Sequence, residues 1–168
     1  MKQNLMLPCL LVSLILLCGS YSSYAQYATA LGIRIGGTSG LTIKHAYRPS
    51  MTFEGIIGGF PNGFSLTGLV EKNTLAFNEP GLSWYYGGGA HIAVYNTGRY
   101  DRFGRELSYP SNNDVGFGVD GIIGLEYRLP DNVPIAFSFD VKPFIEITTD
   151  GYAGFALDPA LGVKFIIR

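Results

Sequence analysis

Apolar and polar residues alternate with a period of two through most of this chain, and this pattern limits its fold more than any other feature. Eight segments show the alternation, and turn residues such as Gly, Pro, Ser and Asn separate them. The segments span 27–36, 41–47, 51–58, 64–71, 82–95, 115–128, 135–142 and 156–167. No long helical period follows residue 26, so the sequence predicts an all-β chain.

The polar face of these segments is unusually small. It consists mainly of Gly, Ala, Ser and Thr, with one to three charges in most segments. A soluble barrel such as a lipocalin would turn its polar face to water and fill it with Lys and Glu. A closed barrel of eight strands instead has an interior just wide enough for its own side chains. We therefore predict an eight-stranded antiparallel up-and-down transmembrane β-barrel, with the polar face inside and the apolar face against lipid.

The charged residues of the strands follow the same parity. Five cations and six anions share the polar face, which suits an interior where buried charges need partners. His91 has the same parity, whereas the weakly basic His45 faces outward. The predicted lumen network comprises Arg34, Lys44, Glu54, Glu71, His91, Asp120, Glu126, Arg128, Asp140, Lys142, Asp158 and Lys164.

The N-terminus has the pattern of an export signal. Lys2 supplies a positive charge, Leu5 to Cys18 are largely apolar, and Ser23-Tyr24-Ala25 offers small residues at the cleavage positions. The apolar run is shorter than the roughly 20 residues of a membrane-spanning helix. The sequence thus predicts a signal peptide at 1–25 and a barrel domain at 26–168, exported to the cell outer membrane.

Composition excludes several other classes of function. Both cysteines, Cys9 and Cys18, lie in the predicted signal, so we expect no disulfide and no cysteine-based metal site. Twelve Lys and Arg residues stand against thirteen Asp and Glu residues, which gives no reason to expect nucleic acid as a partner. Two isolated histidines are too few for a metal site. No motif indicates a cofactor, so none is expected.

An even number of strands places both ends of the barrel domain on one side, normally the periplasm. On this topology "RPS", 72–81 and "LPDN" are periplasmic turns, and "GTSG", "PNG", 96–114 and 146–153 are external. The outward aromatic residues agree: we expect one group near the periplasmic rim and another near the opposite rim. The first group is Tyr27, Tyr47, Trp84, Tyr86 and Tyr127, and the second is Phe64, Phe117 and Phe155.

The long external loop at 96–114 carries a basic and aromatic patch. This patch could bind lipopolysaccharide phosphates or another surface ligand by charge-assisted hydrogen bonds, or the loop could simply be solvated. Its residues are Arg99, Tyr100, Arg102, Phe103, Arg105 and Tyr109.

An export signal followed by eight outward-apolar strands resembles the small outer-membrane β-barrels of Gram-negative bacteria, the OmpA/OmpX-type class. The resemblance covers the chain after the signal and rests on pattern rather than on a motif. It implies a monomer in outer-membrane lipid with a structural or surface-interaction role. Such barrels often end in an aromatic residue, whereas this chain ends "GVKFIIR".

Catalysis is the less favoured interpretation. His91 could act as a general base, but no spacing pairs it with Ser65, Ser83 or Ser138. We therefore predict that the chain is not an enzyme. Two alternatives stay open: an outer-membrane barrel that modifies or binds lipid, and a secreted, soluble, lipocalin-like carrier.

Overall fold

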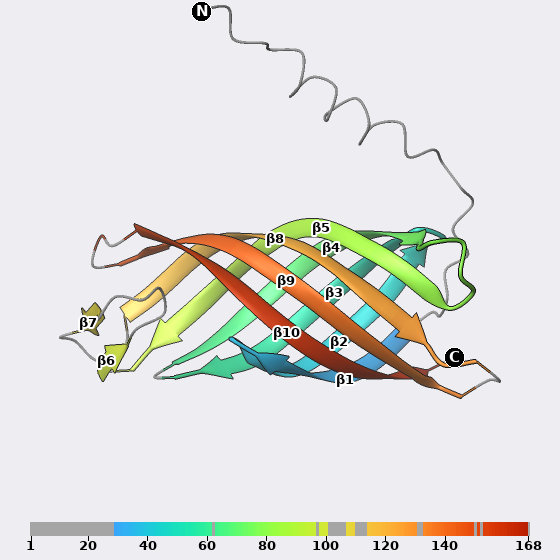
Figure 1. Ribbon diagram of the computed structural model, residues 1–168. Helices are drawn as coiled ribbons and strands as arrows, with labels where there is room; N and C mark the ends of the chain where they lie inside the picture. The colour runs from blue at the N-terminus through green and yellow to red at the C-terminus, as the bar shows by residue number, and fades with distance from the viewer. Residues whose placement is uncertain are drawn as a thin grey trace, which may run out of the picture.

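A computed structural model describes residues 29–61, 63–96, 98–100, 107–109, 114–130, 133–149, 151 and 153–167; for 98–100 and 107–109 it describes the backbone alone. Eight long strands close into a barrel (Figure 1). They are β1 (Thr29–Gly36), β2 (Ser39–Arg48), β3 (Met51–Phe60), β4 (Gly63–Leu75), β5 (Leu82–Tyr95), β8 (Asp114–Arg128), β9 (Ile135–Thr148) and β10 (Ala153–Ile167). Within these ranges no helix has the length and apolar character needed to cross a membrane. The predicted signal peptide, 1–25, lies outside the described residues.

The strands follow one another around the barrel in chain order, and every neighbouring pair is antiparallel. The ring closes between β1 and β10, where Thr29 pairs with Ile167 and Gly36 with Ala160. Closure leaves no strand edge unpaired. The prediction of an all-β, eight-stranded antiparallel up-and-down barrel is confirmed. The end at which Thr29 meets Ile167 is called the termini end below.

Burial alternates residue by residue along the strands. From Phe155 to Ile167 in β10, every second side chain is buried and those between are exposed. Successive side chains of a strand point to opposite faces, so one face lines the lumen and the other forms the outer wall. In each strand, the positions that face the lumen are those that the sequence predicts to face inward.

Several strands extend further than predicted. β4 continues to Leu75, although 72–81 was expected to be a connection. β9 continues to Thr148 and β10 starts at Ala153, so half of the predicted external loop 146–153 is strand. Pairing explains the difference, because Ala153 and Gly154 of β10 continue the ladder with Ile147 and Glu146 of β9.

The predicted loop 96–114 is also partly ordered into strands. β6 (Gly98–Tyr100) and β7 (Leu107–Tyr109) form a small antiparallel hairpin beyond the barrel wall, and Asp114 already belongs to β8. Figure 1 shows this hairpin at the end opposite the C-terminus.

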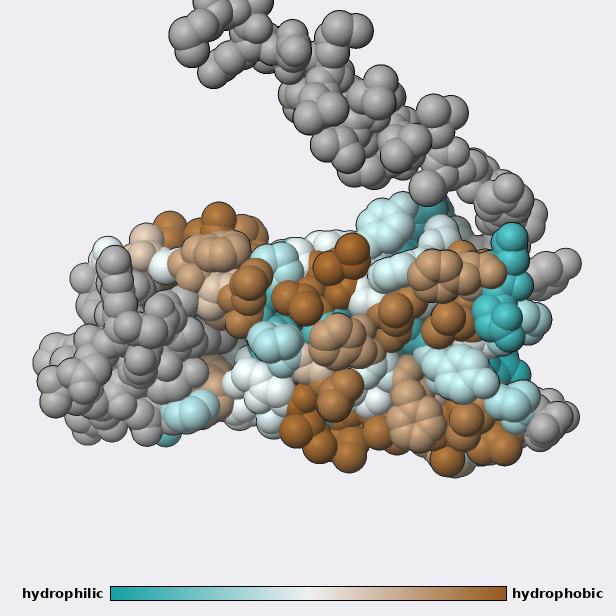
Figure 2. All heavy atoms as spheres, in the orientation of Figure 1, coloured by the Kyte–Doolittle hydropathy of each residue, from teal (hydrophilic) through white to brown (hydrophobic). Residues whose placement is uncertain are grey.

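The outer wall is apolar along most of its length. Large apolar side chains such as Ile57, Val119 and Leu161 expose more than 60% of their surface. Figure 2 shows apolar residues gathered along the wall and hydrophilic ones at the end where Figure 1 marks the C-terminus. The exposed Tyr and Trp side chains of the described residues, Tyr47, Trp84, Tyr86 and Tyr127, lie towards the termini end, whereas Phe64, Phe117 and Phe155 lie towards the other.

Candidate functional site: the charged lumen

The lumen holds nearly all the charged side chains of the barrel wall. Of the twelve residues in the predicted lumen network, eleven are buried and Arg128 is half-buried at the termini end of β8. Each comes from a strand position whose neighbours on both sides face outward, so the alternating backbone aims it inward. The buried eleven expose at most 6% of their surface, so the lumen is tightly filled at their level.

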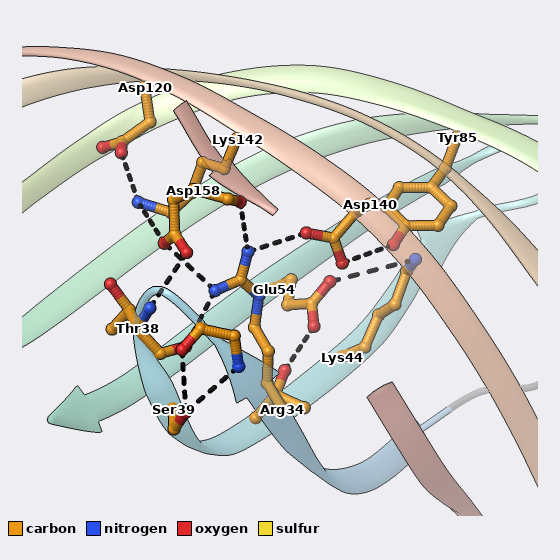
Figure 3. Close-up of polar contacts among 12 residues, drawn as sticks. Arg34, Thr38, Ser39, Lys44, Glu54, Tyr85, Asp120, Asp140, Lys142 and Asp158 are labelled. Carbon is orange, nitrogen blue, oxygen red and sulfur yellow. Dashed lines mark hydrogen bonds and ion pairs between the residues drawn. The ribbon is translucent and has the colours of Figure 1, made fainter. Parts of the chain in front are cut away.

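Arg34 of β1 anchors the first group of ion pairs (Figure 3). Its two terminal nitrogens donate to Asp140 of β9 at 2.7 Å and to Asp158 of β10 at 3.1 Å. Arg34 Nη1 also donates to the carbonyl oxygen of Thr38 at 2.9 Å. A guanidinium suits this role because its planar fork can serve several oxygens at once.

Lys142 extends this group along the lumen. Its ammonium lies 2.8 Å from Asp120 Oδ1 and 3.6 Å from Asp158 Oδ2. The Arg34 cluster therefore consists of Arg34, Asp120, Asp140, Lys142 and Asp158. It joins β1, β8, β9 and β10, which are the strands on either side of the closure.

A second group, the Lys44 cluster, consists of Lys44, Glu54, Glu71, Glu126 and Lys164. Lys44 lies 2.8 Å from Glu71 and 3.4 Å from Glu126. Lys164 lies 3.2 Å from Glu126 and 3.3 Å from Glu54. The five residues come from five strands, so the cluster ties the barrel across its width.

Tyr85 connects the two clusters. Its hydroxyl donates to Asp140 Oδ2 at 2.9 Å, and its ring lies 4.0 Å from the Lys44 ammonium. The ring packs on Gly124, where an added Cβ would stand 2.5 Å from the ring carbon Cζ. Glycine at 124 thus makes room for the tyrosine that joins the two charged groups.

His91 of β5 lies between two carboxylates. Nδ1 is 2.8 Å from Asp120 Oδ2, and Nε2 is 2.8 Å from Glu146 Oε2. A carboxylate accepts hydrogen bonds, so both ring nitrogens must carry hydrogen for both bonds to form. The geometry therefore fits a charged imidazolium. Tyr95 donates its hydroxyl to Glu146 and completes the group.

The surroundings of His91 do not form a nucleophilic site. Both ring nitrogens are engaged by carboxylates, and Ser83 donates to the carbonyl oxygen of Glu126 instead. Activation of a serine or cysteine nucleophile by His91 would need the hydroxyl or thiol within hydrogen-bond reach of the imidazole. Among the side chains that the structure describes, no group of three or more His, Cys, Asp or Glu is arranged to hold a metal ion.

Two buried carboxylates and six large apolar side chains of the lumen were missed in the sequence. Glu146 was placed in an external loop and Asp114 in the long loop, yet both are buried strand residues. For Glu146 a signal existed, because "FIEIT" continues the alternation of β9. The large apolar side chains of the lumen are Ile56, Phe60, Leu69, Ile122, Phe144 and Ile166.

The charge balance of the lumen also differs from the near-neutral prediction. The fully buried charged side chains of the described residues are four cations and eight carboxyl groups. Glu146 and Asp114 raise the number of carboxyl groups, and half-buried Arg128 no longer counts as a buried cation. A protonated His91 offsets part of this excess, because a buried charge without a partner is costly.

No side chain of the predicted surface patch is among those that the structure describes. Arg99, Tyr100 and Tyr109 belong to the β6–β7 hairpin, whose backbone alone is described. Arg102, Phe103 and Arg105 lie outside the described residues.

Comparison of the chain with protein-family models, with curated proteins and with solved structures gave no match.

Proposed function

We propose that this chain is a small integral outer-membrane β-barrel of the OmpA/OmpX type from a Gram-negative bacterium, present as a monomer. The observation that carries the proposal is the polarity of the barrel: twelve charged side chains are buried inside, and large apolar side chains cover the outer wall. Soluble monomers rarely expose continuous apolar surfaces of this kind. Lipid tails would cover the apolar side chains of the outer wall, and the closed strand pairing would satisfy the hydrogen bonds of the backbone.

The same observation disfavours a soluble lipocalin-like carrier. Such a carrier would need an apolar interior for its ligand and a polar outer wall, which is the reverse of this arrangement. Its lumen would also need free space, whereas the Arg34 and Lys44 clusters fill this one with paired charges.

Membrane extraction tests the proposal directly. Cell fractions would be washed with alkaline carbonate and then treated with detergent, and the chain would be followed on gels with and without boiling. We expect it to stay with the membrane until detergent is added and to change its mobility on boiling. A chain that leaves the periplasm in buffer alone would defeat the proposal.

The proposed role is structural or interactive rather than catalytic. The ion pairs of the lumen engage one another, and His91 faces carboxylates instead of a nucleophile. Replacing His91 by Gln should leave the lipid composition of the envelope unchanged, as mass spectrometry of extracted lipids would show. A changed lipid profile at equal barrel abundance would favour a lipid-modifying enzyme.

We further propose that the loop 96–114 is the part that meets surface ligands. Its cations, Arg99, Arg102 and Arg105, could pair with lipopolysaccharide phosphates. Replacing all three by Gln should weaken lipopolysaccharide binding to the refolded barrel in a pull-down assay. Unchanged binding would restrict the loop to a solvated connection.

A further inference from the structure

Surface charge on the described side chains is confined to one end of the barrel. Arg48, Lys72 and Glu79 are exposed and Arg128 is half-buried, and all four lie at the termini end. Three of the four are cations. Every other charged side chain that the structure describes is buried.

Arg48 and Lys72 lie on either side of one residue. Met51 of β3 pairs with Arg48 of β2 and with Lys72 of β4. Neighbouring strands are about 4.8 Å apart, which places the two backbones roughly 10 Å from each other. Both side chains are exposed and long, so their charged ends can approach one headgroup-sized anion.

Aromatic side chains surround this pair of cations. The Arg48 guanidinium lies 5.9 Å from the centre of the Tyr47 ring, and the Tyr47 hydroxyl lies 3.6 Å from Met51 Sδ. Lys72 pairs in register with Tyr86, which is exposed on the outer wall. Tyrosine prefers the boundary between lipid tails and water, so these neighbours indicate the depth of the two cations.

Among the residues described, no carboxylate lies within ion-pair distance of Arg48 or Lys72. Long basic side chains next to apolar surface extend their charged ends towards the headgroup region. In a bilayer, the anions at that depth are lipid phosphates.

We propose that Arg48 and Lys72 bind the phosphate of anionic phospholipid headgroups in the leaflet at the termini end. This inference rests on the proposed membrane location and adds the lipid class that the barrel prefers. Charge complementarity carries it, because Arg48 and Lys72 are exposed at this end and the described residues hold no ion-pair partner for either.

The chain contains its own reporter for the experiment. Trp84 is its one tryptophan and pairs with Thr74, two residues from Lys72 on β4. Brominated lipids quench tryptophan on contact. The barrel would be refolded in phosphatidylcholine bilayers containing increasing brominated phosphatidylglycerol, and Trp84 quenching would give the relative association constant of the anionic lipid.

For the wild-type barrel at low salt we expect a preference of about two- to fivefold per cation for the anionic lipid, since a basic residue near a membrane surface contributes about 1 kcal/mol. Arg48→Gln and Lys72→Gln should each reduce the preference, and the double variant should remove it. The matched double variant Arg48→Lys with Lys72→Arg keeps both charges and should keep the preference. Raising the salt concentration should weaken it in the wild type.

The outcomes separate the two proposals. If brominated phosphatidylcholine alone fails to quench Trp84, the barrel is not in the bilayer and the proposed function fails. If it quenches but the anionic lipid gains no preference, or the neutral double variant keeps that preference, the headgroup site is wrong. Should the double variant not refold, the single variants and the salt dependence of the wild type decide the matter.

Discussion

Glycine in the lumen is a packing requirement at particular residues. The imidazole of His91 packs against Gly118, where an added Cβ would stand 2.2 Å from Cε1. The His91 ring is held on both sides by carboxylates, so it has little freedom to retreat. The size of the residue at 118 therefore decides whether the group around His91 can form.

Replacing Gly118 by Ala should lower the free energy of unfolding by about 1–3 kcal/mol, the usual cost of overfilling a packed interior. Gly68→Ala is the matched control, because its Cβ would meet only the Phe53 ring at 3.7 Å. Urea unfolding followed by Trp84 fluorescence would measure both. Equal stability of the two variants would contradict the packing argument.

The protonation of His91 follows from its two hydrogen bonds. We expect the wild-type barrel at neutral pH to show hydrogen on both ring nitrogens in nitrogen-15 NMR spectra of labelled histidine. His45 is the internal comparison, because it is exposed and its Nδ1 contacts Thr29. A His45→Gln variant would assign the signals, and a single protonated nitrogen on His91 would rule out the imidazolium.

At the scale of the strands, ion pairs across the closure are the most informative contacts. Arg34 of β1 is separated from Asp158 of β10 by 124 positions in sequence, yet the two side chains meet beside the β1–β10 ladder. Breaking a buried pair from one side leaves a charge without a partner. The free energy of unfolding should therefore depend more on Arg34, which lies beside the β1–β10 closure, than on any exposed cation.

Arg34→Met should lower the free energy of unfolding by about 3–5 kcal/mol, because Asp140 and Asp158 lose their shared partner. Arg48→Met removes a cation from the exposed surface and should change it by less than about 0.5 kcal/mol. Urea titration of both refolded proteins provides the measurement. A small effect at Arg34 would show that the cluster adds little to closure.

Strand length is also decided at this scale. The alternation predicts β5 at Leu82–Tyr95, and the structure agrees, because both strand ends coincide with clear turn residues. For β4 the pattern weakens before the ladder ends, whereas "FIEIT" continues the alternation of β9. In β3 and β8 the apolar pairs Ile56-Ile57 and Ile122-Ile123 interrupt the alternation, because the inward members pack with Leu69 and Tyr85 inside the lumen.

At the scale of the whole molecule, the outer wall is the surface in contact with the surrounding medium. A basic residue facing lipid at mid-depth costs about 2–4 kcal/mol, and near the interface about 0–1 kcal/mol. Leu161 lies near the middle of β10, and Ile167 ends β10 at the termini end; both are exposed on the outer wall. The two positions compare the introduction of lysine at different depths.

Leu161→Lys should destabilise the barrel refolded in phospholipid vesicles by about 2–4 kcal/mol, and Ile167→Lys by no more than about 1 kcal/mol. Reversible urea unfolding in vesicles would measure both. Equal costs at the two positions would contradict a lipid-facing wall.

The sequence by itself determined which side chains share a face, because a strand alternates its side chains whatever lies beside it. From that period came the barrel class, the strand count and eleven buried charged or histidine residues of the lumen. Tertiary structure alone decided which charges meet, since partners such as His91 and Glu146 come together only when strands distant in sequence close into one ring. Strand pairing also set the charge balance of the lumen, because the ladder with β5 extends β8 to Asp114 and the ladders of β9 extend it past Glu146, which brings both carboxyl groups inside.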